Sequence, residues 1–451
     1  MATTVTLPLW LLVLILLFAV VTFASHFLFP SVRWFFRKWA ERVIAHMNKR
    51  LTRPIEPFKL ARRYDMIERL VYDPEVARAV NDYARANGVP ESVAFEKARR
   101  YAREIVPSFS ATLYFGVGTR LSRWLSRTMY RLRLGAFENE KLDAIDREAA
   151  VVFVMNHRSN MDYVLVTYLV SRASALSYAV GEWARVWPLS SIIRTMGAYF
   201  IRRRYKGELY RRVLGRYVQL ATDAGVTQAI FPEGGLTLTG RLAKPRLGLL
   251  SYIVTNWAPD KREVIFVPVA LNYDRVLEDT FLIAAEKAGE RKFRAPLGTI
   301  LGAATRHIWQ RITLRLRPFG TASVSFGSPL ELSSFIQTTD RADLTEAVAD
   351  ELMSRIEDVM PILPVPLVSH LLLAGGPMTQ AQLTEVAAKA LSDSAAAGCS
   401  VPRRDAAAVV GDALTLMRER SLIVDSPEGF IPSDRIDVLR FYAASIEHLM
   451  R

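Results

Sequence analysis

The stretch that decides the fold is A-A-V-V-F-V-M-N-H-R-S-N-M-D-Y, residues 149–163. Its first seven residues are all apolar, which is typical of a strand buried on both faces of a sheet. The polar turn N-H-R-S-N follows, and after Met161 the residues D-Y-V-L-V-T-Y-L-V have the composition of an apolar helix. The sequence therefore predicts a strand, a turn and a helix, with one histidine and one aspartate at the junction.

The spacing of His157 and Asp162 has a geometric consequence. On one continuous helix, five steps of about 100° would place the two side chains roughly 140° apart. A turn between them allows Asp162, in the first helical turn, to accept a hydrogen bond from one ring nitrogen of His157, so that the other acts as a base. Two structural roles compete with this prediction, since the aspartate could be only a helix cap and the histidine only a core residue. Because the nucleophile-elbow pattern G-x-S-x-G is absent, the base is expected to activate a substrate hydroxyl.

Short runs rich in β-branched residues alternate with helical stretches between residues 141 and 335, which is the pattern of an α/β domain. We expect a mixed sheet flanked by helices. Its predicted strands are 149–155, 227–231, 264–272, 312–317 and 322–326. Pro268 lies inside the third of these, where a residue without an N–H would be unusual unless the strand bends.

Two further stretches follow predicted apolar runs. G-A-Y-F-I-R-R-R-Y-K-G (197–207) presents three consecutive arginines, and guanidinium groups bind phosphate in a bidentate manner, although a solvated basic loop is the alternative. In F-P-E-G-G-L-T-L-T-G-R (231–241), the paired glycines allow a ligand to approach the backbone closely, or serve only a structural turn. Glu233 would either bind a substrate hydroxyl or fix the loop.

The N-terminal part differs in character. Residues 5–29 contain no Lys, Arg, Asp or Glu and are long enough to cross a bilayer core of roughly 30 Å, so we expect a transmembrane anchor within residues 1–30. Six basic residues between positions 33 and 50 place the rest of the chain in the cytoplasm by the positive-inside rule. Residues 31–140 are expected to be helical. Residues 336–451 are expected to be mostly helical, with one possible small hairpin.

Within the N-terminal helical region, residues 118–134 carry five arginines among Leu, Trp, Met and Tyr. This composition suits a helix lying at an anionic lipid surface, and an ordinary helix with a solvated basic face is the alternative. The whole chain has 59 basic and 45 acidic residues, a formal charge of +14, which favours nucleic acid, an acidic membrane or a phosphorylated substrate as partner. A single cysteine, Cys399, excludes an internal disulfide, and no cluster of Cys and His predicts a metal site.

Four stretches in order, N-H-R-S-N-M-D-Y, G-A-Y-F-I-R-R-R-Y-K-G, F-P-E-G-G-L-T-L-T-G-R and V-P-V-A-L-N-Y-D, resemble the four blocks of the glycerolipid acyltransferase superfamily. They are most similar to those of the bacterial membrane-bound glycerol-3-phosphate acyltransferases. The resemblance implies that an acyl group moves from acyl-CoA or acyl-carrier protein to the 1-hydroxyl of glycerol 3-phosphate, the first step of phospholipid synthesis. It implies no metal and no cofactor, and an enzyme at the cytoplasmic face of the inner membrane, in contact with membrane lipids.

The resemblance also assigns roles to residues. It makes His157 the general base and Asp162 the group that orients and charge-balances the imidazole. The substrate-binding residues that it implies are Arg158, Arg202, Arg203, Glu233, Gly234, Gly235 and Arg241.

One departure weakens the assignment of the acceptor. The family commonly has arginine where this chain has Leu236 and Leu238, so lysophosphatidic acid and dihydroxyacetone phosphate stay open as acceptors. The alternative from another class is a membrane-anchored basic binding protein directed to nucleic acid. No recognition helix rich in Arg, Asn and Gln stands out, so a nucleic-acid partner is not expected.

Overall fold

The structure is a computed structural model with two compact units, residues 1–55 and 56–451. The described residues are 8, 10–17, 38, 42, 44, 45, 48, 49, 51–137, 139–171, 174–181, 185, 189–202, 207–289 and 319–450. In the first unit, residues 10–17 are helical, and most of the predicted membrane segment lies outside the described residues. Among the residues that the structure describes, no helix has the length and apolar character needed to cross a membrane.

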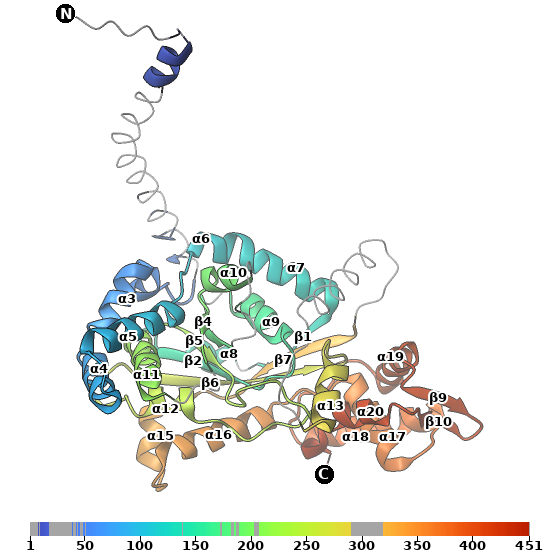
Figure 1. The fold of residues 1–451 in the computed structure, drawn as a ribbon. Helices are drawn as coiled ribbons and strands as arrows, with labels where there is room; N and C mark the ends of the chain where they lie inside the picture. Colours follow the sequence, from blue (N-terminus) through green and yellow to red (C-terminus); the bar gives the residue numbers. More distant parts are fainter. Residues whose placement is uncertain are drawn as a thin grey trace, which may run out of the picture. The chain divides into compact units, whose positions relative to one another are not determined.

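The second unit is built on one mixed sheet (Figure 1). Its strand order is β1-β7-β6-β2-β5-β3-β4, and the short β8 also pairs with β6. Strands β6, β2, β5, β3 and β4 run parallel, whereas β7 and β8 are antiparallel to β6. The bounds are β1 (Arg131–Phe137), β2 (Ala150–Met155), β3 (Ser177–Val180), β4 (Tyr199–Phe200), β5 (Gln228–Ile230), β6 (Val264–Tyr273), β7 (Thr321–Phe326) and β8 (Leu330–Glu331). The predicted mixed sheet flanked by helices is confirmed.

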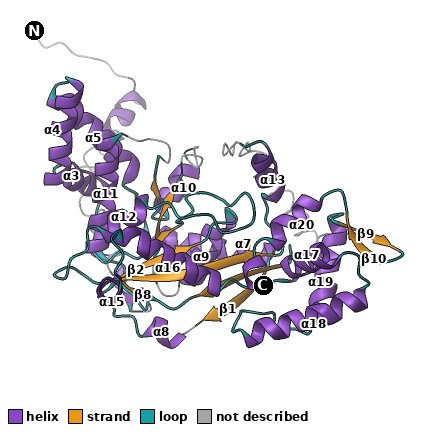
Figure 2. Cartoon of the chain, turned by 90° about the horizontal axis from the view of Figure 1, so that it is seen from below, coloured by secondary structure: helices purple, strands orange, loops and turns teal. Residues whose placement is uncertain are grey.

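Helices cover both faces of this sheet (Figure 2). Side chains of β2 alternate between two cores, Val151 and Phe153 facing one and Val152 and Val154 the other, which is why every position of this strand is apolar. The first core is closed by α7 (Thr119–Met129), α9 (Met161–Val170), α13 (Asp279–Lys287), α17 (Pro364–Gly375), α18 (Gln380–Ala396), α19 (Ala406–Glu419) and α20 (Ile436–Ala443). The second is closed by α3 (Arg63–Val71), α4 (Pro74–Asn87), α5 (Glu91–Ile105), α11 (Glu208–Asp223), α12 (Gly248–Val254), α15 (Leu332–Thr338) and α16 (Leu344–Asp358).

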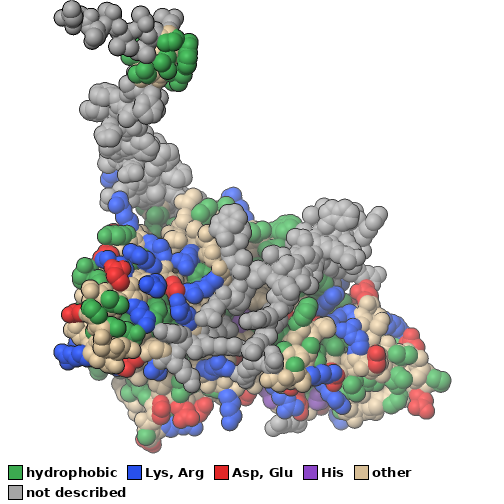
Figure 3. Space-filling model, in the orientation of Figure 1, with side chains coloured by type: hydrophobic (Ala, Val, Ile, Leu, Met, Phe, Trp, Pro, Cys, Tyr) green, Lys and Arg blue, Asp and Glu red, His purple; other side chains and the backbone are tan. Residues whose placement is uncertain are grey.

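The remaining elements are short. They are α2 (Pro57–Leu60), α6 (Ala111–Leu113), the π-helical turn η1 (Tyr114–Gly118), α8 (Asn139–Asp143), α10 (Leu189–Thr195), the hairpin β9 (Ile423–Ser426) and β10 (Gly429–Pro432), and the 3₁₀ turn η3 (Glu447–Leu449). The hairpin confirms the one expected in the C-terminal region. Basic side chains are spread over the face drawn in Figure 3.

The predicted strands at 149–155, 227–231, 264–272 and 322–326 are confirmed as β2, β5, β6 and β7, and the one at 312–317 lies outside the described residues. The expectation of a helix throughout 118–134 is wrong at its end. The helix α7 stops at Met129, and R-L-R-L-G-A-F forms the edge strand β1, paired with β7 alone. Alternation of Arg and Leu fits one half-buried strand, and it extends the sheet to a point before the predicted domain start at 141.

Pro268 lies inside β6 where that strand changes partner. On one edge, Ile265 and Phe266 pair with β8, and Val269 onward pairs with β7. The Pro268 carbonyl accepts a hydrogen bond from the Gly327 N–H at this same edge, so the proline nitrogen also faces the gap between the two antiparallel partners. No ladder hydrogen bond is lost there, which explains how a proline is accommodated in a central strand.

Candidate active site

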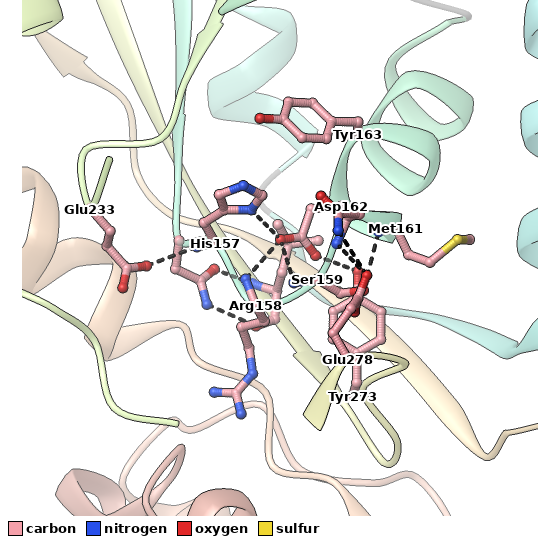
Figure 4. Close-up of polar contacts among 12 residues, drawn as sticks. His157, Arg158, Ser159, Met161, Asp162, Tyr163, Glu233, Tyr273 and Glu278 are labelled. Carbon is pink, nitrogen blue, oxygen red and sulfur yellow. Dashed lines mark hydrogen bonds and ion pairs between the residues drawn. The ribbon is translucent and has the colours of Figure 1, made fainter. Parts of the chain in front are cut away.

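His157 follows the end of β2, and Asp162 lies in the first turn of α9. The turn between them folds the aspartate back, and the His157 Nδ1 atom lies 2.9 Å from Asp162 Oδ2 (Figure 4). An ionised carboxylate only accepts hydrogen bonds, so Nδ1 donates and Nε2 is the basic nitrogen of the neutral ring. The predicted contact between the two side chains is therefore present.

The Asp162 carboxylate is fully buried and is held by several donors. Its Oδ2 atom accepts hydrogen bonds from the backbone N–H groups of Arg158 (2.8 Å) and Ser159 (3.0 Å) in addition to the imidazole. Its Oδ1 atom accepts from the Tyr273 hydroxyl at 2.5 Å. Burial and the neighbouring Asp162 charge raise the pKa of Tyr273 well above its ordinary value, so this hydroxyl keeps its proton and donates. These contacts fix the orientation of the carboxylate toward the ring.

A second buried carboxylate holds the turn itself. Glu278 accepts hydrogen bonds from the Ser159 hydroxyl (2.8 Å), the Asn160 N–H (3.2 Å) and the Asn160 side-chain amide (3.0 Å). The Ser159 hydroxyl in turn accepts from the Met161 N–H, one of the donors at the start of α9 that have no partner within the helix. Burial raises the pKa of Glu278, and the hydrogen bonds from Ser159 and Asn160 oppose that rise. The turn is thus fixed from the loop after β6.

Glu233 fixes the backbone on the other side of the histidine. Its carboxylate accepts hydrogen bonds from the N–H groups of His157 (2.8 Å) and Ala243 (3.0 Å), and the Thr237 N–H donates to the His157 carbonyl (2.9 Å). Of the two roles that the sequence left open, these contacts support the one in which Glu233 fixes the loop. Burial raises its pKa to about 7, although the two backbone hydrogen bonds and Arg158 act in the opposite direction.

This raised pKa leads to a testable pH dependence. Between pH 4.5 and 7 the folded protein keeps a proton on Glu233 that the unfolded chain has released, so the free energy of unfolding falls as the pH rises through this window. We expect Glu233→Gln to reduce the slope of stability against pH by up to about 1.4 kcal/mol per pH unit, the value for one proton. Urea unfolding in detergent at several pH values measures it.

A matched control for this experiment is Glu428→Gln, at an exposed carboxyl in the β9–β10 turn. The slope of the Glu428→Gln protein should equal that of the unsubstituted chain. Asp274 contributes to the remaining slope, because burial raises its pKa to about 6 and gives the same sign. Equal slopes for the Glu233→Gln and unsubstituted proteins would contradict a protonated Glu233 in the folded state.

Other residues of the chain pack closely against glycines of the segment 231–241. Gly234 has a φ of +67°, and a Cβ atom there would lie 2.6 Å from the Cδ atom of Arg246. Gly235 follows it in the same turn and is partly buried. Gly240 has a φ of +84°, and a Cβ atom would lie 1.8 Å from the Phe441 carbonyl oxygen of α20. Glycine at 234 and 240 is therefore required for backbone conformation and close packing.

Arg158 is directed away from the imidazole (Figure 4). The residue is 2% exposed, its Nη1 donates to the Gly240 carbonyl at 2.8 Å, and its guanidinium lies 5.6 Å from the ring centre of Phe441. Burial lowers the pKa of this guanidinium. Its contacts join the turn between β2 and α9 to the loop after β5 and to α20, and a substrate-binding role for Arg158 stays a prediction.

Arg202 follows β4, and Arg203 lies outside the described residues. The Arg202 guanidinium donates to both oxygens of Glu104 in α5 (2.8 and 2.5 Å), and Arg185 contacts the same carboxylate at 2.7 Å. Burial would raise the pKa of Glu104, but the hydrogen bonds from Arg202 and Arg185 outweigh it and lower the pKa. One acidic side chain therefore holds two guanidinium groups together.

The basic side chain Arg202 and the candidate catalytic residues lie at the same edge of the sheet. His157, Glu233 and Arg202 follow the carboxyl ends of the parallel strands β2, β5 and β4, where α/β proteins bind ligands. In the order β2-β5-β3-β4, three steps of about 4.8 Å separate the first strand from the last, or about 14 Å between backbones. A long arginine side chain and a small substrate can span that distance.

Arg241, Leu236 and Leu238, which also belong to the third block, make contacts other than with His157. Arg241 is 61% exposed and pairs with Glu447 at 2.5 Å, an exposed ion pair of the kind that contributes little to stability. Leu236 and Leu238 pack against the core on the α9 face of the sheet. The departure from the family pattern thus replaces two cationic side chains by apolar packing.

The imidazole of His157 is enclosed by aromatic side chains. The ring centre of Phe231 lies 4.2 Å away and that of Tyr163 lies 5.3 Å away, edge on, and the histidine is 2% exposed. This enclosure keeps bulk water from the basic nitrogen. Among the described residues, no group of three or more His, Cys, Asp or Glu is arranged to hold a metal ion.

The fold and this geometry define a class, that of α/β proteins with a histidine and carboxylate pair at the carboxyl ends of parallel strands. Residues 136–272 match the Acyltransferase family, and residues 308–445 match the glycerol-3-phosphate acyltransferase C-terminal region. These two matches agree with the resemblance of the four blocks to the glycerolipid acyltransferases, and they cover successive parts of the chain, the acyltransferase domain first and the C-terminal region second.

Curated relatives bear the name glycerol-3-phosphate acyltransferase. The one from Actinobacillus succinogenes is 32% identical over 290 residues, which cover 62% of this chain and 33% of the relative. The one from Pseudomonas aeruginosa is 29% identical over 353 residues, covering 73% and 40%. The matched region thus spans between a third and two fifths of these relatives. Among solved structures, the 1-acyl-sn-glycerophosphate (LPA) acyltransferase PlsC from Thermotoga maritima is similar to this chain with a TM-score of 0.33 and 16% sequence identity. The similar region covers 54% of this chain and 76% of that one, and at this TM-score no conclusion follows from it.

Proposed function

We propose that this chain is an enzyme that transfers an acyl group from an acyl thioester to the 1-hydroxyl of glycerol 3-phosphate. The observation that carries the proposal is the fixed pair of His157 and Asp162 at the same sheet edge as Arg202. The pair supplies a base for a substrate hydroxyl, and Arg202 supplies a cation for a phosphate. The matches to the acyltransferase family and to the glycerol-3-phosphate acyltransferase C-terminal region support the same reaction.

In the proposed reaction, Arg202 and Arg185 bind the phosphate and the 1-hydroxyl lies at His157 Nε2. The hydroxyl oxygen attacks the thioester carbonyl carbon as Nε2 takes its proton, which forms a tetrahedral intermediate and an imidazolium. The Asp162 carboxylate stabilises that imidazolium through Nδ1. The intermediate then expels the thiolate, which takes the proton from Nε2 and leaves as the free thiol. General-base catalysis of this kind typically contributes about 10²- to 10⁴-fold.

The proposed donors are acyl-CoA or acyl-carrier protein, and no cofactor is needed for this proton transfer. We also propose that the enzyme acts at the cytoplasmic face of the inner membrane, anchored by the apolar segment 5–29. The charge of +14 supports that proposal, because it attracts anionic lipid, phosphate and acidic acyl carriers. The segment itself lies largely outside the described residues.

The decisive experiment offers three acceptors in parallel with one acyl-CoA and measures thiol release and lipid product. Glycerol 3-phosphate is expected to give the highest kcat/KM, above dihydroxyacetone phosphate and lysophosphatidic acid. A preference for lysophosphatidic acid would overturn the proposed acceptor while retaining acyl transfer. Absence of thiol release with all three would overturn the proposed reaction.

The contact of Glu104 with Arg202 and Arg185 gives a prediction for acceptor binding. We expect Glu104→Gln to raise the KM for glycerol 3-phosphate about tenfold with kcat nearly unchanged. The reason is that each charged hydrogen bond that positions a guanidinium is typically worth about 1.5–3 kcal/mol. Steady-state kinetics measures the two constants separately.

Glu96→Gln on the same helix is the matched control, because Glu96 pairs with Arg99 at a more exposed position. It should leave both constants unchanged. A lower KM in the Glu104→Gln enzyme would show instead that this carboxylate competes with the phosphate for the arginines.

A further inference from the structure

The segment α6–η1–α7 exposes large apolar side chains. Leu113, Val117, Leu121 and Trp124 are between 43% and 59% exposed. Their spacings of four, four and three residues place them along one stripe of a helix. Isolated apolar residues on a surface are ordinary, but an aligned row on one helical segment indicates an interaction site.

The helix α7 has three distinct faces. Ser122, Ser126 and Met129 form the buried face, and the helix packs mainly on α9. Leu121 and Trp124 continue the exposed apolar stripe. Arg120, Arg123 and Arg127 are all exposed and, at spacings of three and four residues, lie together beside that stripe. An apolar stripe flanked by arginines is the arrangement of helices that lie in the interface of an anionic membrane.

The surrounding sequence has the same sign of charge. Residues 107–137 include five arginines and no aspartate or glutamate. The neighbouring α10 adds Ile192, which is 54% exposed, and the end of α10 is joined to the start of α6 by a hydrogen bond from the Ser110 N–H to the Thr195 carbonyl. Figure 1 shows α6, α7 and α10 on one side of the sheet, and Figure 3 shows hydrophobic and basic side chains there.

This segment lies next to the catalytic helix. The helix α7 packs on α9, which begins at the His157 turn, and the Arg127 guanidinium lies 5.9 Å from the ring centre of Tyr168 in α9. A bilayer in contact with α7 would therefore be one helix away from the candidate base. A long-chain acyl donor and a lipid product both partition into a bilayer.

We propose that the α7 surface, formed by Leu113, Val117, Leu121, Trp124, Arg120, Arg123 and Arg127, docks on an anionic lipid bilayer. The apolar stripe enters the headgroup boundary and the arginines pair with lipid phosphates. The contact is additional to the predicted anchor at residues 5–29. Charge complementarity identifies lipid as the partner, because a row of arginines without an acidic neighbour in the sequence matches a uniformly anionic surface.

The test places an environment-sensitive fluorophore on the α7 surface of the full chain. In a Cys399→Ser background, Val117→Cys carries the label in one protein and Val424→Cys in another. Val424 is a matched control, 50% exposed on β9. Both proteins are reconstituted in nanodiscs that contain phosphatidylglycerol and brominated lipid. Bromine quenches a fluorophore only near the bilayer, so residues 5–29 do not contribute to the signal.

We expect brominated lipid to quench the label at 117 by about half, since interfacial helices enter the bilayer by about 5–10 Å, and to leave the label at 424 unaffected. Replacing Arg120, Arg123 and Arg127 by glutamine should weaken this docking by on the order of 100-fold, whereas replacing Arg404, Arg418 and Arg440 should not. Equal quenching at 117 and 424 would overturn the proposal. Neither readout requires acyl transfer.

Discussion

Replacing His157 with alanine is expected to lower kcat for acyl transfer by at least about 10²- to 10⁴-fold, the contribution of a positioned general base. The substitution removes the imidazole, which is the part of His157 that the proposed chemistry uses. The backbone contacts of residue 157 with Glu233 and Thr237 remain. Binding of glycerol 3-phosphate should change little, since the phosphate contacts that we propose are on Arg202 and Arg185. Thiol release at saturating substrate measures kcat.

His448→Ala provides the matched control, at a histidine on η3 whose ring contacts the Glu357 carbonyl. Its turnover should equal that of the unsubstituted enzyme. Circular dichroism of both proteins tests whether the fold is retained. A folded His157→Ala enzyme with unaltered kcat would show that the imidazole is a core residue, the structural role that the sequence allowed.

Asp162→Asn is expected to lower kcat by up to about 10⁴-fold, as for an aspartate that orients a catalytic histidine. The amide oxygen can still accept from Nδ1 and from the N–H groups of Arg158 and Ser159, so the geometry is largely retained. The negative charge that favours the imidazolium is lost. The acidic limb of the pH profile of kcat/KM should therefore move to lower pH.

Tyr273→Phe separates the charge of Asp162 from its orientation. This change removes one hydrogen bond to Oδ1 and leaves the carboxylate ionised, so a loss of about tenfold is expected, equivalent to about 1.4 kcal/mol. The acidic limb should move much less than in Asp162→Asn. If both variants lost activity equally and shifted the limb equally, the charge of Asp162 would not be the quantity that matters.

The sequence predicted the parts of this site that are local in the chain. The apolar run 149–155 and the polar turn after it were sufficient to predict β2, the break and the contact of His157 with Asp162, because these features depend on neighbouring residues. The strands β2, β5, β6 and β7 were predicted for the same reason. The two-residue strand β4 is too short to give a pattern, and the first residues of β1 were predicted as the end of the preceding helix.

The residues that sequence reasoning missed act over long separations. Tyr273 contacts Asp162 from 111 positions away, Glu278 contacts Ser159 from 119, and Glu104 contacts Arg202 from 98. No local pattern marks these pairs, because buried polar groups are matched only when the strands come together. The block V-P-V-A-L-N-Y-D did carry a signal for Tyr273, a polar aromatic residue at the end of a buried strand.

The packing of α20 has a consequence for the order of folding. Phe441 lies against Arg158 and Gly240, and the Tyr442 hydroxyl accepts from the Val276 N–H over a separation of 166 residues. Contacts over such separations form late, since closing a long loop has an entropic cost that must be met first. In a nascent chain that has already formed the parallel strands, Arg158 would lack its contact with Phe441 of α20. Catalytic competence is thus expected to appear in the last folding phase, together with docking of α20, and not when the sheet forms.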